Sequence, residues 1–186
     1  MNLPNKLSVL RLILIPVFAA FFYLTAIPYN YVIATAVFVI ASCTDFLDGH
    51  IARKYNLVTN LGKFLDPIAD KVLVSTALIL VAGTSVLFPV VGVISVAVIL
   101  ARELIISGFR QVAAKTGFVM AADKIGKVKT TFQDVSLVAL LLSLQFAEVK
   151  WLNYTGNVLL LVATALTIVS GVHYIVKNRA VLKDPD

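Results

Sequence analysis

Hydrophobic residues along this chain fall in six long runs and not in short alternating segments. The runs predict helices over residues 7–24, 31–54, 61–84, 87–114, 126–146 and 151–177. Several runs approach or exceed the roughly 18 residues that a helix needs to cross a bilayer. Because lipid offers no hydrogen bonds to the backbone, such segments must be helical. A water-soluble bundle is disfavoured, since each of its helices would carry a polar stripe.

Composition supports an all-α membrane protein with six transmembrane helices. The chain has 186 residues and 60% of them are hydrophobic, whereas soluble domains are about half apolar. No linker, repeat or soluble domain interrupts the pattern, so residues 1–186 are expected to form a single membrane domain. Cys43 is the only cysteine, which excludes an internal disulfide.

The formal net charge of +6 does not imply a nucleic-acid partner, because basic residues of membrane proteins face anionic lipid headgroups. With the N-terminus inside, Lys150 is the only one of the 16 lysines and arginines in an outer loop. The positive-inside rule therefore places both termini in the cytoplasm, in a multi-pass protein of the cell membrane. Residues 1–6, which contain Pro4 and Asn5, are expected to form a short amphipathic lead-in, although a frayed tail fits the pattern equally well.

Four aspartates lie near the predicted inner ends of the second and third helices. Asp45 and Asp48 are three residues apart, and Asp66 and Asp70 are four apart, so each pair shares a helix face. A helical rise of about 1.5 Å per residue puts Asp45 and Asp70 roughly 21 Å from the outer surface, and Asp48 and Asp66 near 26 Å. Neighbouring antiparallel helices would therefore present two carboxylate pairs at matching depths.

Carboxylates this close need a counter-charge. Two unit charges about 4 Å apart repel by about 4 kcal/mol at an effective dielectric of 20, and an aspartate in the centre of a membrane helix costs about 2.5–3.5 kcal/mol more. Bound divalent cations remove this penalty. Hard oxygen ligands suit Mg²⁺, Mn²⁺ or Ca²⁺ better than zinc, and two divalent cations, for which we expect Mg²⁺ or Mn²⁺, can stabilise a phosphoryl displacement.

Neighbouring residues suit a phosphate-bearing substrate. Gly49 lets a ligand approach the backbone, Ala52 keeps the same helix face narrow, and Arg53 offers a bidentate fork to phosphate. Four basic residues and a threonine lie at the inner ends of the fourth and fifth helices. They predict a pocket for a phosphate on the acceptor: Arg110, Lys124, Lys127, Lys129 and Thr130. The alternative for each lysine is a basic fringe that faces lipid headgroups.

Three further charges, Arg102, Glu103 and Asp134, fall within predicted membrane helices. Intramembrane charges are functional by default, but a structural pair that joins two helices explains these residues equally well. Lys71, next to Asp70, is expected to neutralise or orient a carboxylate.

The pattern Asp45-x2-Asp48-Gly49-x2-Ala52-Arg53-x8-Gly62-x3-Asp66-x3-Asp70 resembles the signature of the CDP-alcohol phosphotransferases. The resemblance implies that Asp45, Asp48, Asp66 and Asp70 bind two divalent cations and that Asp70 is also the catalytic base. It further implies a homodimer and a CDP-binding region that contains Asn5, Asp45, Asp48, Gly49, Ala52, Arg53 and Asp66. The family's reaction transfers a phosphatidyl group from a CDP-lipid to an alcohol and releases CMP.

Two further stretches of sequence, which are less fixed in the family than the aspartate motif, indicate which alcohol accepts the phosphatidyl group. Residues 2–11 and the pattern Arg102-Glu103-Leu104-x3-Gly108-x-Arg110 resemble family members that use CDP-diacylglycerol and glycerol-3-phosphate. Phosphatidylglycerol, serine and an inositol phosphate are the alternative acceptors. Outside the enzyme class, a divalent-cation transporter could use the same aspartates, but such proteins often have broken helices in repeated halves, which this sequence lacks. A scaffold with a vestigial site fits poorly with an intact motif.

Overall fold

The computed structural model describes residues 3–54, 60–115 and 124–179. Within these ranges, the side chains of residues 3–4, 45–54, 60–61, 63–64, 67, 114–115 and 124 lie outside the description. The described chain is all-helical, and its six helices confirm the number predicted from the hydrophobic runs. They are α1 (Leu3–Tyr23), α2 (Asn30–Lys54), α3 (Asn60–Ala82), α4 (Val91–Lys115), α5 (Lys124–Gln145) and α6 (Lys150–Lys177).

Three of these helices contain a segment that is long and apolar enough to cross a membrane: Asn5–Tyr23, Val91–Ala113 and Lys150–Lys177. The described apolar part of α2 is Asn30–Thr44, and the acidic motif begins directly after it in the sequence. Charged residues likewise occupy the first turns of α3 and α5. Many large apolar side chains, such as Leu104 at 73% exposure, face outward, as expected of a surface that contacts lipid.

The start of α1 corrects one expectation. Residues 3–6 do not form a separate lead-in but the first turn of a helix that continues to Tyr23. Proline is tolerated in a first helical turn, where its missing N–H has no intrahelical partner to lose, so Pro4 does not interrupt the helix. Asn5 is only 5% exposed and therefore packs inside the protein.

The start of α4 also differs from the prediction, at Val91 instead of residue 87. Val90 has a φ of 62°, a left-handed conformation that a β-branched residue rarely adopts. Two asparagines of α6 hold the preceding turn: Asn157 Oδ1 accepts a hydrogen bond from the Phe88 N–H at 2.8 Å, and Asn153 Nδ2 donates to the Val86 carbonyl at 2.7 Å. These polar contacts keep residues 86–90 out of the helix.

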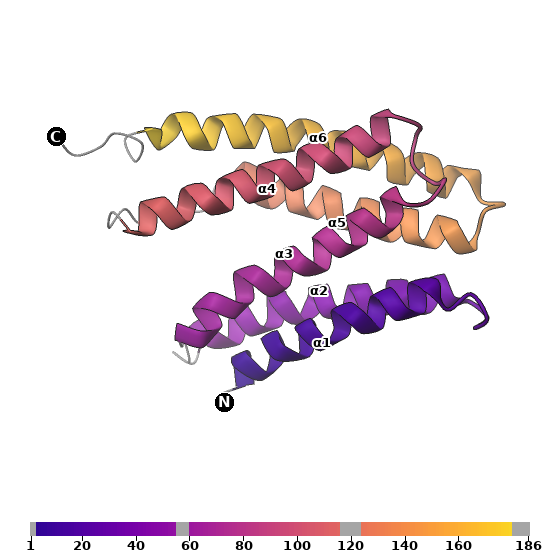
Figure 1. The fold of residues 1–186 in the computed structure, drawn as a ribbon, viewed down its shortest axis with the longest axis horizontal. Coiled ribbons are helices and arrows are strands. Elements are labelled where there is room, and N and C mark those ends of the chain that lie inside the picture. The colour runs from indigo at the N-terminus through magenta and orange to yellow at the C-terminus, as the bar shows by residue number, and fades with distance from the viewer. Residues whose placement is uncertain (1–2, 55–59, 116–123, 180–186) are drawn as a thin grey trace.

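The helices pack as two groups (Figure 1), which meet where α2 contacts α5 and where α3 contacts α4 and α5. α1 packs against α2 and α3, and α6 packs against α4 and α5. Phe18 and Phe38 lie with ring centroids 5.8 Å apart in the core between α1 and α2. The beginning of α1 and the end of α6 lie at the same end of the bundle (Figure 1).

Candidate active site

Two of the four predicted metal-binding aspartates, Asp66 and Asp70, lie one turn apart on α3, and both are partly buried. The Ser8 hydroxyl of α1 donates a hydrogen bond to Asp66 Oδ1 at 2.5 Å. Ser8 is fully buried, so the packing of α1 on α3 orients this carboxylate. Sequence reasoning missed Ser8, because only the packing of the two helices shows which face of α1 meets Asp66.

The other motif residues lie on α2, in a part of the helix whose side chains are outside the description: Asp45, Asp48, Gly49, Ala52 and Arg53. Among the described residues, no group of three or more His, Cys, Asp or Glu side chains gathers in one place. The described half of the motif still fits a hard divalent cation, because Asp66 and Asp70 offer only oxygen donors from one helix face.

A cavity of about 250 Å³ opens beside Asp70, between α3, α4, α5 and α6. Four residues predicted to bind the acceptor phosphate line this cavity: Arg110, Lys127, Lys129 and Thr130. The fifth, Lys124, begins α5, and its side chain is outside the description. The structure therefore brings most of the predicted basic group to one cavity, directly next to the predicted base.

The charge of this cavity favours an anion. Its lining contains five basic side chains and two acidic ones, an excess of three positive charges: Lys71, Arg102, Arg110, Lys127 and Lys129 against Asp70 and Glu103. A phosphate group, which accepts charge-assisted hydrogen bonds from lysine and arginine, is the ligand chemistry that this lining fits.

The guanidinium group of Arg110 contacts Tyr174 of α6. Its Nε donates to the Tyr174 hydroxyl at 3.0 Å, and its guanidinium carbon lies 5.3 Å from the centre of the Tyr174 ring. A guanidinium has five N–H donors in a planar fork, and the Tyr174 contact uses one of them. Arg110 also lines the cavity, so the Tyr174 contact helps to orient its guanidinium group there.

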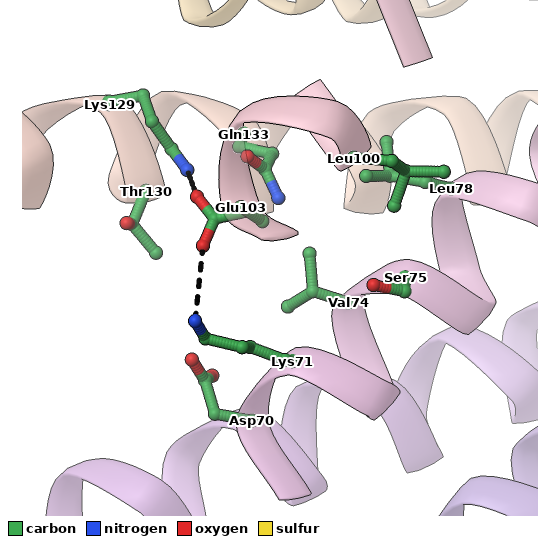
Figure 2. Close-up of a pocket in the computed structure, with 10 residues that line it drawn as sticks. All are labelled: Asp70, Lys71, Val74, Ser75, Leu78, Leu100, Glu103, Lys129, Thr130 and Gln133. Carbon is green, nitrogen blue, oxygen red and sulfur yellow. Dashed lines mark hydrogen bonds and ion pairs between the residues drawn. The ribbon is translucent and has the colours of Figure 1, made fainter. Parts of the chain in front are cut away.

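Glu103 lies at the centre of an ion cluster that connects three helices (Figure 2). Lys129 Nζ of α5 is 2.5 Å from Glu103 Oε1, Arg102 Nη1 is 3.1 Å from the same oxygen, and Lys71 Nζ of α3 is 3.9 Å from Oε2. Lys71 also donates to the Ser107 hydroxyl. Glu103 therefore forms ion pairs that join helices, as one of its two sequence-based interpretations proposed, and the same cluster forms one wall of the cavity.

The Lys129 side chain is only 4% exposed, and Glu103 is the carboxylate that pairs with it. Glu103→Gln leaves that ammonium without a counter-charge, and breaking a buried ion pair in this way costs about 3–5 kcal/mol. We expect a clear fall in the thermal unfolding midpoint in detergent. Glu103→Gln combined with Lys129→Met should recover much of the loss. An unchanged midpoint in the single variant would show that the cluster contributes nothing to stability.

Comparison with known proteins shows the family of the chain. The family model "CDP-alcohol phosphatidyltransferase" matches residues 1–169, and the chain belongs to this family of enzymes. It is 43% identical to the CDP-diacylglycerol–glycerol-3-phosphate 3-phosphatidyltransferase of Bacillus subtilis, over 98% of this chain and 97% of the relative. It is 40% identical to the proteins of the same name from Escherichia coli K12, over 98% of both chains, and Rickettsia bellii, over 93% of both.

Proposed function

We propose that the protein transfers the phosphatidyl group of CDP-diacylglycerol to the hydroxyl group of glycerol-3-phosphate, which yields phosphatidylglycerophosphate and CMP. The observation that carries the proposal is the position of Asp70, which lines a cavity with an excess of three positive charges. A proton acceptor and an anion-binding wall at one place are what a phosphate-bearing alcohol requires. The names of the full-length relatives point to the same pair of substrates.

The reaction follows from this arrangement. Glycerol-3-phosphate places its phosphate against Arg110, Lys127 and Lys129, and its reacting hydroxyl reaches Asp70. Asp70 takes the proton of that hydroxyl as its oxygen attacks the lipid-side phosphorus. A new P–O bond to the acceptor forms, the P–O bond to CMP breaks, and the electron pair leaves with CMP. No covalent enzyme intermediate is needed.

The CDP-lipid is expected on the α1–α2–α3 side of Asp70. Asp45, Asp48, Asp66 and Asp70 would hold two Mg²⁺ or Mn²⁺ ions, which supply positive charge to the pyrophosphate of the donor. The remaining members of the proposed CDP-binding region are Asn5, Gly49, Ala52 and Arg53. Asn5 is buried on the same helix as Ser8, which donates to Asp66, so α1 contributes polar groups next to this motif.

The proposed reaction takes place at the cytoplasmic side of the cell membrane. All six helices cross the cell membrane, with both termini and the active site on the cytoplasmic side, where nearly all basic residues lie. Membrane lipids surround a homodimer. Serine carries no phosphate, so it would leave the basic residues of the cavity without an anionic ligand. The cavity therefore favours glycerol-3-phosphate over serine as the acceptor. Family membership also argues against a divalent-cation transporter.

The direct test measures the release of CMP. Purified protein with CDP-diacylglycerol and Mg²⁺ should release CMP only after glycerol-3-phosphate is added, in amounts equal to the new lipid formed. CMP release that does not depend on the acceptor would indicate hydrolysis and would contradict phosphatidyl transfer.

We expect Arg110→Gln to raise the KM for glycerol-3-phosphate about 10- to 100-fold, because a hydrogen bond to a charged group is worth about 1.5–3 kcal/mol. The KM for CDP-diacylglycerol should change little, since Arg110 lies on α4 in the acceptor cavity. Steady-state kinetics with each substrate varied in turn measures both values. Arg179→Gln, at an exposed position beyond α6, is the matched control and should change neither. An equal rise in both KM values would place Arg110 outside the acceptor site.

A further inference from the structure

Gln133 of α5 is a buried amide that the proposed mechanism does not yet use. Its side chain is only 2% exposed, and its Oε1 is fully enclosed with no hydrogen-bond partner among the described residues. A buried acceptor left without a donor costs about 1–3 kcal/mol, so native proteins rarely leave one unsatisfied. Rotation of the amide about its terminal bond exchanges Oε1 and Nε2 and would turn Oε1 toward the neighbouring cavity, where a hydroxyl group of a bound ligand could donate to it.

Gln133 lines a small cavity of about 40 Å³ that adjoins the larger one. The two cavities share five lining residues: Asp70, Lys71, Glu103, Lys129 and Thr130. Figure 2 shows Asp70 on α3 and Gln133 on α5 at opposite walls of the small cavity, with Glu103 between them. The volume is enough for a hydroxyl group or a water-sized group, but not for a lipid chain.

The order of groups in glycerol-3-phosphate matches this arrangement. The phosphate is on one end carbon, the reacting hydroxyl is on the other, and a second hydroxyl lies on the carbon between them. When the phosphate occupies the larger cavity and the reacting hydroxyl reaches Asp70, the middle carbon lies at the wall that the two cavities share. The hydroxyl on the middle carbon then faces the small cavity and the Gln133 amide.

We infer that Gln133 is a specificity residue, whose Oε1 accepts a hydrogen bond from the middle hydroxyl of the acceptor once the amide has rotated toward the small cavity. The inference rests on the proposed function, since it presumes that glycerol-3-phosphate is the acceptor. A site with a buried group that pairs with a substrate hydroxyl rejects analogues that lack this hydroxyl, because the protein group is then left unpaired. Gln133 thus selects a vicinal diol phosphate over a simple alcohol phosphate.

The test compares glycerol-3-phosphate with 3-hydroxypropyl phosphate, which differs only by lacking the middle hydroxyl. We expect the wild-type protein to prefer glycerol-3-phosphate by about 10- to 100-fold in kcat/KM. In Gln133→Leu the preference should fall to within about 3-fold of unity, mainly through loss of activity on glycerol-3-phosphate. The ratio of the two kcat/KM values does not depend on how much of the preparation is folded.

Gln145 offers a matched control on the same helix. Its Oε1 is also buried without a partner among the described residues, but it lies twelve residues further along α5, roughly 18 Å away, and lines neither cavity. Gln145→Leu should keep the wild-type preference. If Gln133→Leu does not fold, Gln133→Met removes the same polar atoms from an unbranched side chain.

Two results would overturn the inference: a wild-type protein that uses both acceptors equally well, or a Gln133 variant that keeps the full preference. The first needs no variant at all. Both are distinct from failure of the proposed function, in which the wild-type protein would form no lipid from glycerol-3-phosphate.

Discussion

Asp70→Asn is expected to lower the turnover number by about 1,000-fold or more while the protein stays folded. Asparagine has nearly the same shape but cannot take the proton of the acceptor hydroxyl, and general-base catalysis alone contributes about 10²–10⁴-fold. Asparagine is also a weaker ligand for a hard cation than a carboxylate. CMP release measures the turnover, and circular dichroism with thermal unfolding in detergent measures the fold.

The control for this variant is Glu148→Gln, a carboxylate-to-amide change in the exposed segment between α5 and α6, which should leave turnover unchanged. An Asp70→Asn protein that keeps more than a tenth of the wild-type turnover would exclude Asp70 as the base.

Removal of divalent cations is expected to abolish turnover, and Mg²⁺ or Mn²⁺ should restore it. Closely spaced carboxylates repel one another strongly unless cations lie between them, and oxygen donors favour hard ions. Binding that favours the native state also raises its stability. Addition of Mn²⁺ to chelator-treated protein should therefore raise the thermal unfolding midpoint.

The stability measurement separates metal binding from catalysis. In Asp66→Asn the Mn²⁺-dependent rise in the midpoint should shrink or vanish, whereas Glu148→Gln should show the full rise. Turnover that survives exhaustive chelation, or an Mn²⁺ effect that is unchanged in Asp66→Asn, would contradict a metal site built from these aspartates.

The helices could be predicted from the sequence because lipid imposes a simple rule on apolar runs. The errors arose at helix ends, where local chemistry decides. Pro4 fits a first helical turn, so α1 begins at Leu3, and asparagines from α6, far away in sequence, hold the turn before Val91. Neither the proline in the first turn nor the hydrogen bonds of the asparagines can be recognised in the hydrophobic pattern.

The site was predictable to the extent that it depends on spacing within a helix. The aspartate pairs and the basic residues of α4 and α5 follow such spacings, and the structure brings Arg110, Lys127, Lys129 and Thr130 to one cavity with Asp70. Contacts between helices could not be predicted in the same way. Which charge meets Glu103, and which residue holds Arg110, depends on how α3, α4, α5 and α6 pack.

The most direct test is a competition between acceptors. Purified protein, CDP-diacylglycerol and Mg²⁺ are mixed with equal concentrations of glycerol-3-phosphate, phosphatidylglycerol, serine and an inositol phosphate, and the lipid products are identified by mass spectrometry. We expect phosphatidylglycerophosphate as the dominant product, because the cavity beside Asp70 is basic and small. A dominant product from any of the other three acceptors would contradict the assignment of this cavity to glycerol-3-phosphate.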